Sequence, residues 1–311
     1  KLIRMASISS PPQRSESLLG YAVKVLESKE CSRKVALTLE AYQLWKESKL
    51  VLRKEGTTYH PPQIPARPDD LKIVAPHMAS KRGKGGSLSS RIAMIHSFAH
   101  IESWAIDLSW DILLRFHKGY EDIELPLDFF SDWLKVAWDE ARHFSMWSKR
   151  LKELDTYYGA LGVHNALWQS AEDTNDTLIN RLAVIHMVHE ARGLDVTPKS
   201  IARLQSGGDK KSGNLLREIY EDEITHVQAG VKWFRYLCKA LNKDPISTFH
   251  RIVKERFHGP LKPPFNTKAR TQAGFTEEWY MPLVRNKYQC PKHTSKKESK
   301  SNTKEAVSII N

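Results

Sequence analysis

Two short stretches of the chain repeat one pattern of carboxylate and imidazole side chains. Residues 139–143 read Asp-Glu-Ala-Arg-His and residues 222–226 read Asp-Glu-Ile-Thr-His, so each contains Glu-x-x-His. On an α-helix, positions i and i+3 lie on the same face, so each stretch points a carboxylate and an imidazole in one direction. Carboxylates and imidazoles together bind iron and manganese. Two copies in one chain therefore predict a metal site between helices.

Each repeat follows another segment with helical periodicity, and that segment carries one glutamate in its apolar stripe. Glu102 lies within a predicted helix over residues 89–117, and Glu190 lies within one that starts near Asn175. The separation is similar in the two halves, because 38 residues lead from Glu102 to Glu140 and 33 from Glu190 to Glu223. The pattern predicts two related helix pairs, each supplying half of one site.

The combined set has the composition of a carboxylate-bridged dinuclear metal site in a four-helix bundle. Four carboxylates balance the charge of two divalent ions, and bridging carboxylates hold such ions about 3.5–4 Å apart. We expect two iron ions, with manganese as the alternative, and open positions for dioxygen or a substrate. The predicted metal ligands are Glu102, Glu140, His143, Glu190, Glu223 and His226.

The positions of the glutamates favour a metal over the ordinary alternative. A single Glu-x-x-His usually belongs to a solvated helix face. Here the glutamates interrupt apolar stripes, as Glu140 does between Val136 and Phe144. Burying one unpaired carboxylate costs several kcal/mol or more. Arginines would neutralise one or two such groups, whereas two metal ions neutralise all four.

Three neighbouring residues have two interpretations each, and a fourth is an alternative ligand. Asp139 and Asp222 precede the motif glutamates, and they either accept a hydrogen bond from a ligand histidine or lie exposed on their helices. His186 shares a helical face with Glu190 and is an alternative ligand. Tyr220 either lines the site or packs against neighbouring helices.

The rest of the chain predicts an all-α fold, because period-two alternation is scarce. The predicted fold is a four-helix bundle with extra N- and C-terminal helices. We expect an N-terminal helical extension (1–60), a Pro/Gly-rich connector (61–88), the di-metal bundle (89–258) and a Pro-rich, then basic, disordered tail (259–311).

The expected helices span residues 15–30, 33–48, 89–117, 126–157, 175–193, 214–241 and 246–257. Gly193 and Pro198 are helix stop signals, so the third long helix should end near Gly193. Residues 158–175 and 195–213 should then be irregular, apart from a short helix in the first and a turn in the second. These two excursions are candidates for the walls of a substrate pocket.

The composition is that of a soluble globular protein. Of 311 residues, 41% are hydrophobic and 27% charged, which is ordinary for that class. No apolar run approaches the roughly 18 residues needed to cross a bilayer. Three scattered cysteines without C-x-x-C fit a reducing compartment. We expect a cytoplasmic protein; an organelle is the alternative, because residues 1–15 contain basic residues but no acid, as transit peptides do.

The net charge of +12 is concentrated at the ends of the chain. Residues 1–60 hold 11 basic and 6 acidic side chains, and residues 285–311 hold 7 and 2. Residues 61–284 are therefore nearly neutral. Basic ends either bind nucleic-acid phosphates without sequence specificity or are simply solvated.

Four stretches resemble the ferritin-like family catalogued as domain of unknown function 455. They are residues 96–102 (HSFAHIE), 139–144 (DEARHF), 189–198 (HEARGLDVTP) and 222–227 (DEITHV). The resemblance runs from about residue 15 to 260. It implies a ferritin-like bundle with a dinuclear metal centre, for which all six ligand positions are present here. It supplies no reaction. A more distant similarity to ferritin-like tRNA hydroxylases suggests oxygenase chemistry by analogy of fold alone.

Three hypotheses for the function follow. The first is an O₂-activating di-iron oxidase or hydroxylase whose substrate is a small organic molecule or RNA. The second is a ferroxidase or another iron-handling protein, although the extra terminal helices and the connector argue against a storage cage. The third is a non-enzymatic interaction module that the metals stabilise. Metal content, oxygen consumption and particle size separate the three.

Overall fold

A computed structural model of the chain describes residues 16–80, 83 and 85–284. Within these residues the regular secondary structure is helical, and β-type pairing is limited to isolated bridges. The fold class is therefore predominantly helical, as predicted. Among the described helices, none combines the length and apolarity needed to cross a membrane. The possible transit peptide (1–15) and the basic C-terminal end (285–311) lie outside the described residues.

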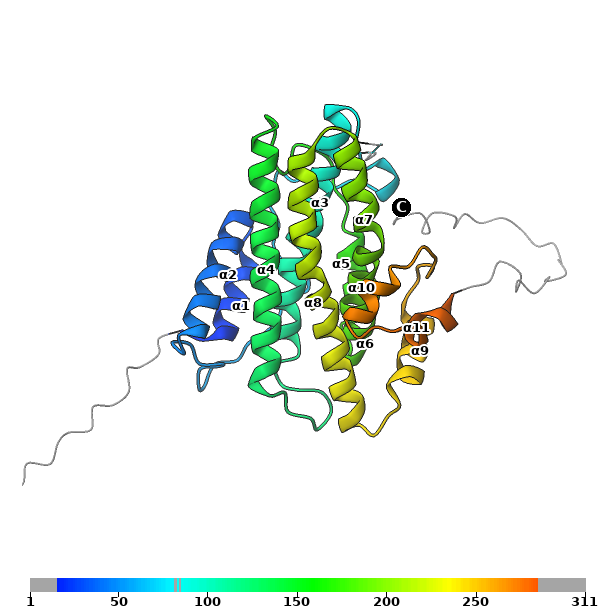
Figure 1. Cartoon of the computed structure of the whole chain (residues 1–311). Coiled ribbons are helices and arrows are strands. Elements are labelled where there is room, and N and C mark those ends of the chain that lie inside the picture. Colours follow the sequence, from blue (N-terminus) through cyan, green and yellow to red (C-terminus); the bar gives the residue numbers. More distant parts are fainter. Residues whose placement is uncertain (1–15, 81–82, 84, 285–311) are drawn as a thin grey trace, which may run out of the picture.

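Four long helical segments lie side by side and form what we call the four-segment core (Figure 1). The first and fourth begin at polar caps, because the side chains of Ser87 and Asp209 accept hydrogen bonds from the first-turn N–H groups of Ser90 and Ser212. The segments are α3 (Leu88–Arg115), α4 (Leu127–Lys152), a third segment made of α6 (Leu178–Ala183), a π-helical turn (Val184–His189) and α7 (Glu190–Ser206), and α8 (Lys210–Ala240).

The third segment corrects the prediction of a helix end near Gly193. α7 continues through Gly193 and Pro198 to Ser206. Pro198 has no N–H group, so the carbonyl oxygen of Leu194 lacks its usual helical donor. The side chain of Asn266 donates a hydrogen bond to this oxygen at 3.2 Å instead. A tertiary contact thus compensates for the proline.

The irregular segment predicted over residues 195–213 is accordingly short. Residues 195–206 belong to α7, and α8 starts at Lys210 rather than at Asn214. The sequence analysis also missed the π-helical turn before Glu190. At this turn α8 comes so close that a Cβ atom on Gly230 would lie 2.2 Å from the carbonyl oxygen of His186, so glycine is required at position 230.

Two short helices, α1 (Leu18–Glu27) and α2 (Cys31–Lys46), cover one side of the core and pack against α3 and α4 (Figure 1). These two helices match those predicted over residues 15–30 and 33–48. A connector with one 3-10 turn (Pro76–Met78) leads to α3, and α5 (Ala166–Glu172) is the short helix expected between the second and third segments.

The C-terminal part contradicts the prediction of a disordered tail for residues 267–283. These residues form α10 (Thr267–Gln272), α11 (Glu277–Tyr280) and a 3-10 turn (Met281–Leu283), after α9 (Pro245–Arg256). The guanidinium of Arg270 pairs with Asp195 of α7 at 2.6 Å. Aromatic rings surround it at 4.4–5.3 Å, namely those of Phe265, Phe275 and Tyr280. Helical periodicity could not reveal this packing, because the elements are too short.

Candidate metal centre

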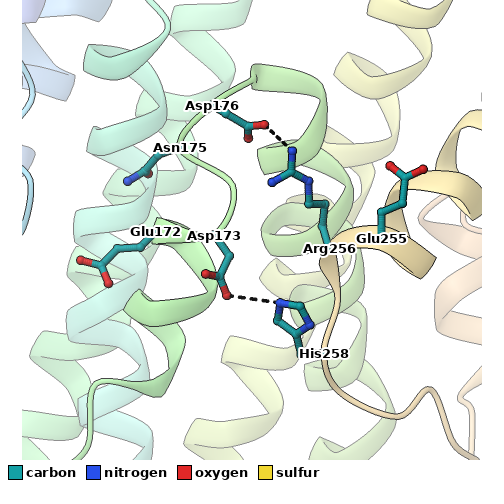
Figure 2. Close-up of a pocket in the computed structure, with 7 residues that line it drawn as sticks. All are labelled: Glu172, Asp173, Asn175, Asp176, Glu255, Arg256 and His258. Carbon is teal, nitrogen blue, oxygen red and sulfur yellow. Dashed lines mark hydrogen bonds and ion pairs between the residues drawn. The ribbon is translucent and has the colours of Figure 1, made fainter.

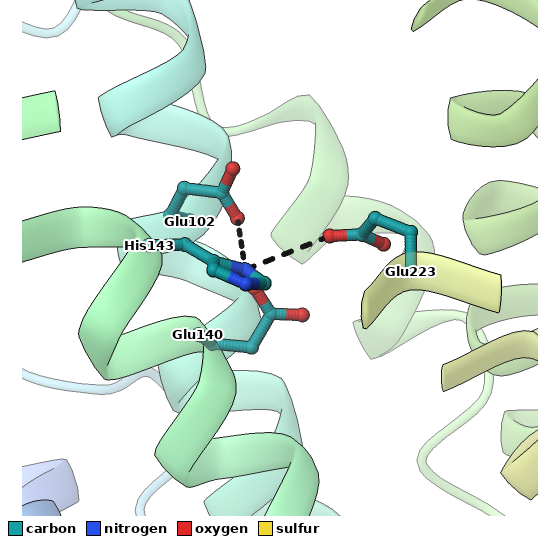
Figure 3. A group of neighbouring side chains, drawn as sticks. All are labelled: Glu102, Glu140, His143 and Glu223. Atoms are coloured by element: carbon teal, nitrogen blue, oxygen red, sulfur yellow. Dashed lines mark hydrogen bonds and ion pairs between the residues drawn. The ribbon is translucent and has the colours of Figure 1, made fainter. Parts of the chain in front are cut away.

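The six predicted ligands meet in the middle of the four-segment core, with contributions from all four segments. Their ligand atoms form two groups, and the atoms of each group lie within 4.8 Å of one another. The first group is Glu102, Glu140, His143 and Glu223 (Figure 3), and the second is Glu140, Glu190, Glu223 and His226. Two glutamates are common to both groups, so each group has one glutamate and one histidine of its own.

The cluster is buried, with one more accessible side. Glu140, His143 and His226 are at most 1% exposed, and Glu102 is 6% exposed. Glu190 and Glu223 are partly exposed. These two glutamates belong to α7 and α8.

The two histidines are held by aspartates of the opposite motif. Nε2 of His143 lies 3.0 Å from Oδ2 of Asp222, and Nε2 of His226 lies 3.3 Å from Oδ2 of Asp139. A carboxylate only accepts hydrogen bonds, so each Nε2 carries the proton. Asp139 is fully buried. Of the two interpretations of these aspartates, the structure therefore supports the one in which they orient the histidines.

The other ring nitrogens face the glutamates. Nδ1 of His143 lies 3.3 Å from Glu140 and 3.8 Å from Glu223. Nδ1 of His226 lies 3.1 Å from Glu140 and 3.5 Å from Glu223, yet it makes no hydrogen bond within the described chain. With Nε2 protonated, a neutral ring directs the Nδ1 lone pair at carboxylate oxygens. Such an arrangement is unfavourable unless a cation or a proton lies between them, so the donor set fits a metal.

Protonation takes the role of a cation when no metal is bound. Burial, followed by the charges of neighbouring glutamates, raises the pKa of Glu102 and of Glu190 well above the usual range. Burial alone would lower the pKa of His143, but the hydrogen bond to Asp222 and the nearby Glu140 raise it to about 9. The cluster therefore retains protons that bound metal ions would displace.

No arginine or lysine neutralises these glutamates. Among the described residues, the ion pairs of Glu102, Glu140 and Glu223 are all with His143 or His226, and Glu190 has none. The alternative in which arginines compensate part of the buried charge does not apply here.

Arg142 belongs to the site although the sequence analysis did not single it out. Its guanidinium lies 3.3 Å from Asp139 and 3.4 Å from Asp222, and so it joins the two aspartates that hold the histidines. It also stacks over Trp138 with 4.7 Å between the guanidinium carbon and the ring centre. The feature of the sequence that could have identified Arg142 as part of the site is its position immediately before His143.

The remaining candidates lie outside the two groups. His186 is buried against Trp133 and contributes to neither. The hydroxyl of Tyr220 accepts a hydrogen bond from the side chain of Asn266 at 2.7 Å. Tyr220 therefore packs against the C-terminal part, which is the second of its two interpretations.

An open hollow of about 650 Å³ lies elsewhere, between the α5–α6 connection and the end of α9 (Figure 2). Its lining is mostly acidic and contains the ion pairs Arg256–Asp176 at 2.7 Å and His258–Asp173 at 3.8 Å. None of the six clustered residues lines it, so the hollow is not an entrance to the cluster.

Comparison with known proteins identifies relatives but no activity. The sequence profile described as "Protein of unknown function (DUF455)" matches residues 27–281. A protein from Haemophilus influenzae described as "Uncharacterized protein" is 36% identical over 215 residues, which cover 69% of this chain and 74% of that protein. No solved structure matches the chain significantly. The matched region contains all six clustered residues, and the chain belongs to the DUF455 family.

Proposed function

We propose that this protein is a ferritin-like dinuclear metal protein, with two iron ions (or manganese), that activates dioxygen as an oxidase or hydroxylase. The observation that carries the proposal is the sharing of Glu140 and Glu223 between two groups of ligand atoms. Two carboxylates common to both groups, with one glutamate and one histidine for each ion, match the ligand set of dinuclear sites in four-helix bundles.

The residues have distinct roles in this proposal. Glu140 and Glu223 would be shared by the two ions, because their two oxygens face different histidines. Glu102 and Glu190 would each hold one ion, together with Nδ1 of one histidine. Two ferrous ions bound there would supply electrons for the reduction of dioxygen. The partly exposed Glu190 and Glu223 lie on the side from which dioxygen and a substrate would arrive.

Metal analysis tests the site. Protein purified without oxygen should contain two iron or manganese ions per chain. Glu140→Ala should lose both ions, because the bridging position serves both, whereas Glu102→Ala should lose mainly one. Glu172→Ala, in the acidic hollow of Figure 2, is the matched control and should retain both. Wild-type protein that binds neither metal would refute the proposal.

Oxygen uptake tests the reaction class. Reduced, iron-loaded protein should consume dioxygen and develop the absorption of oxidised iron on exposure to air. A metal-loaded protein that consumes none has a structural centre instead, which is the interaction-module hypothesis. A particle of cage size would favour iron storage.

A further inference from the structure

One buried side chain near the cluster lacks every partner that its chemistry requires. His186 lies in the π-helical turn and is 1% exposed, and neither ring nitrogen has a hydrogen-bond partner within the described chain. A neutral imidazole has one donor and one acceptor, and leaving both unpaired in an interior is strongly unfavourable. His100, also buried, uses both nitrogens, with Tyr158 at 2.9 Å and the His164 carbonyl oxygen at 2.8 Å.

His186 lies beside the cluster rather than at a distant point of the core. It precedes Glu190 by four residues, and its carbonyl oxygen meets α8 at Gly230, four residues after His226. Burial, and then the charge of Arg181, hold the pKa of His186 well below its usual range, and the charges of Glu140 and His226 also act on it. The ring is therefore neutral and close to the second group of ligands.

A second unpaired donor adjoins it. The ring of Trp133, from α4, lies against that of His186 with 4.2 Å between the ring centres. Trp133 is fully buried, and its Nε1–H also has no partner within the described residues. An indole N–H only donates hydrogen bonds. A molecule that hydrogen-bonds to both rings must therefore accept a hydrogen bond from Trp133. Trp133 precedes Glu140 by about two helical turns, and His186 precedes Glu190 by about one.

We infer that His186 is a positioning residue that hydrogen-bonds a small oxygen- or nitrogen-containing ligand, such as water, hydroxide or azide, held between it and the dinuclear centre. Trp133 is the second donor of the same subsite. The inference rests on the proposed metal centre but assigns His186 no metal. The π-helical turn supports it, because such irregular turns often occur at functional sites.

Azide binding to the iron-loaded protein tests the inference. The dissociation constant is measured from the azide-to-iron absorption band. His186→Leu should retain two metal ions but bind azide at least tenfold more weakly, because one hydrogen bond is lost. His186→Asn, which keeps a donor and an acceptor, should recover part of the affinity. His189→Leu, in the same π-helical turn but against Phe257, is the matched control and should behave as wild type.

Metal-free protein provides a second, independent measurement. If the ring of His186 truly had no partner, His186→Leu would raise the unfolding temperature; with a bound ligand or water it should not. The inference is overturned if azide affinity in His186→Leu equals that of wild type at full metal content, if the unfolding temperature rises, or if His186→Leu loses metal as a ligand variant would. Wild type without metal would instead refute the proposed function, and the inference with it.

Discussion

Buried acidic side chains on two faces of α3 have different kinds of partner. On the face toward the four-segment core, Glu102 lies with two other glutamates and one histidine, and among the described residues it has no ion pair with a lysine or arginine. On the face toward α1 and α2, Asp107 is also buried, but it pairs with Lys34 at 2.5 Å and with Arg67 at 2.6 Å. We call the line of buried polar residues that contains Asp107 the outer face of α3; it consists of His96, His100, Ser103, Asp107 and Asp111.

The other buried aspartates outside the cluster are likewise paired with basic side chains of the chain itself. Asp111 pairs with Arg115 at 2.7 Å and also with Arg181. Asp195 pairs with Arg270 at 2.6 Å, and Asp209 pairs with Arg150 at 3.0 Å. Removing one partner of such a pair leaves an uncompensated charge in the interior. The chain thus supplies its own cations wherever it buries an aspartate in a structural role.

The difference is that the core-facing cluster has no lysine or arginine partner among the described residues. A protein that pairs four buried aspartates with its own arginines and lysines leaves four clustered glutamates without such a partner. Their charge is balanced only by protons on the cluster itself or by metal ions. The following predictions test this contrast, beginning with the largest expected effect.

Amide substitutions on the two faces of α3 should lower the free energy of unfolding of metal-free protein by very different amounts. Asp107→Asn leaves Lys34 and Arg67 buried without a counter-charge, and we expect it to lower the free energy of unfolding by about 3–5 kcal/mol. Glu102→Gln replaces a carboxyl whose raised pKa keeps it protonated, so its cost should stay below about 1 kcal/mol. Denaturant unfolding measures both. Equal losses would show that the contrast is wrong.

Removing the acceptor that orients a histidine should weaken metal binding without abolishing it. Asp222→Asn no longer accepts the Nε2–H of His143 as a carboxylate, and loss of such a partner typically lowers metal affinity by about 10–100-fold. The measurement is competition with a chelator. Glu221→Gln changes the exposed acid next to it and should leave the affinity unchanged; if both variants behave alike, Asp222 has no specific role.

Acid should destabilise the outer face through His96. Its Nε2 accepts the N–H group of Gly159 at 2.9 Å, and burial lowers its pKa to about 4. The pKa of a histidine in the unfolded chain is about 6.5. The contribution of neutral His96 to the free energy of unfolding is therefore fully present above pH 6.5 and is lost as the pH falls toward 4. Between pH 7 and pH 5 we expect this residue to account for a loss of about 2 kcal/mol.

The check is the difference in free energy of unfolding between pH 7 and pH 5, in wild type and in two variants. His96→Gln should reduce that difference by the amount expected for His96. His60→Gln, at an exposed position, should leave it unchanged. An unchanged pH dependence in His96→Gln would show that the ring of His96 does not remain neutral in the folded protein.

The smallest expected effect concerns the segment that carries Glu190. Asn266→Ala removes the donor to the carbonyl oxygen of Leu194, and we expect a loss of about 1 kcal/mol. In a Pro198→Ala background a backbone N–H group replaces this donor, so Asn266→Ala should cost less. A double-mutant cycle measures the coupling. Zero coupling would mean that Asn266 does not compensate for the proline.

The sequence predicted the long helices and the six clustered residues because both depend on local geometry. Positions three and four residues apart share a helical face, so an apolar stripe reveals which way Glu102 or Glu190 points, whatever packs against it. For the same reason the N-terminal helices and the short α5 were predicted. The similarity of the two halves then showed that four such faces converge.

Other features depended on contacts between residues far apart in sequence. α7 passes through Gly193 and Pro198 because Asn266, more than sixty positions later in the chain, supplies the missing donor. Residues 267–283 fold because Arg270 finds Asp195. Local propensity predicts an interruption at the first place and disorder at the second, and in both the tertiary partner outweighs it.

The sequence by itself determined which residue types face the interior at the cluster and that their charges do not balance within it. Only the tertiary structure decided how they combine: which two glutamates are shared, which nitrogen of each histidine faces them, and that Arg142 joins the two aspartates behind. The physical reason is that a helix fixes the direction of a side chain through its own hydrogen bonds. The atoms that this side chain meets are fixed by the packing of helices against one another.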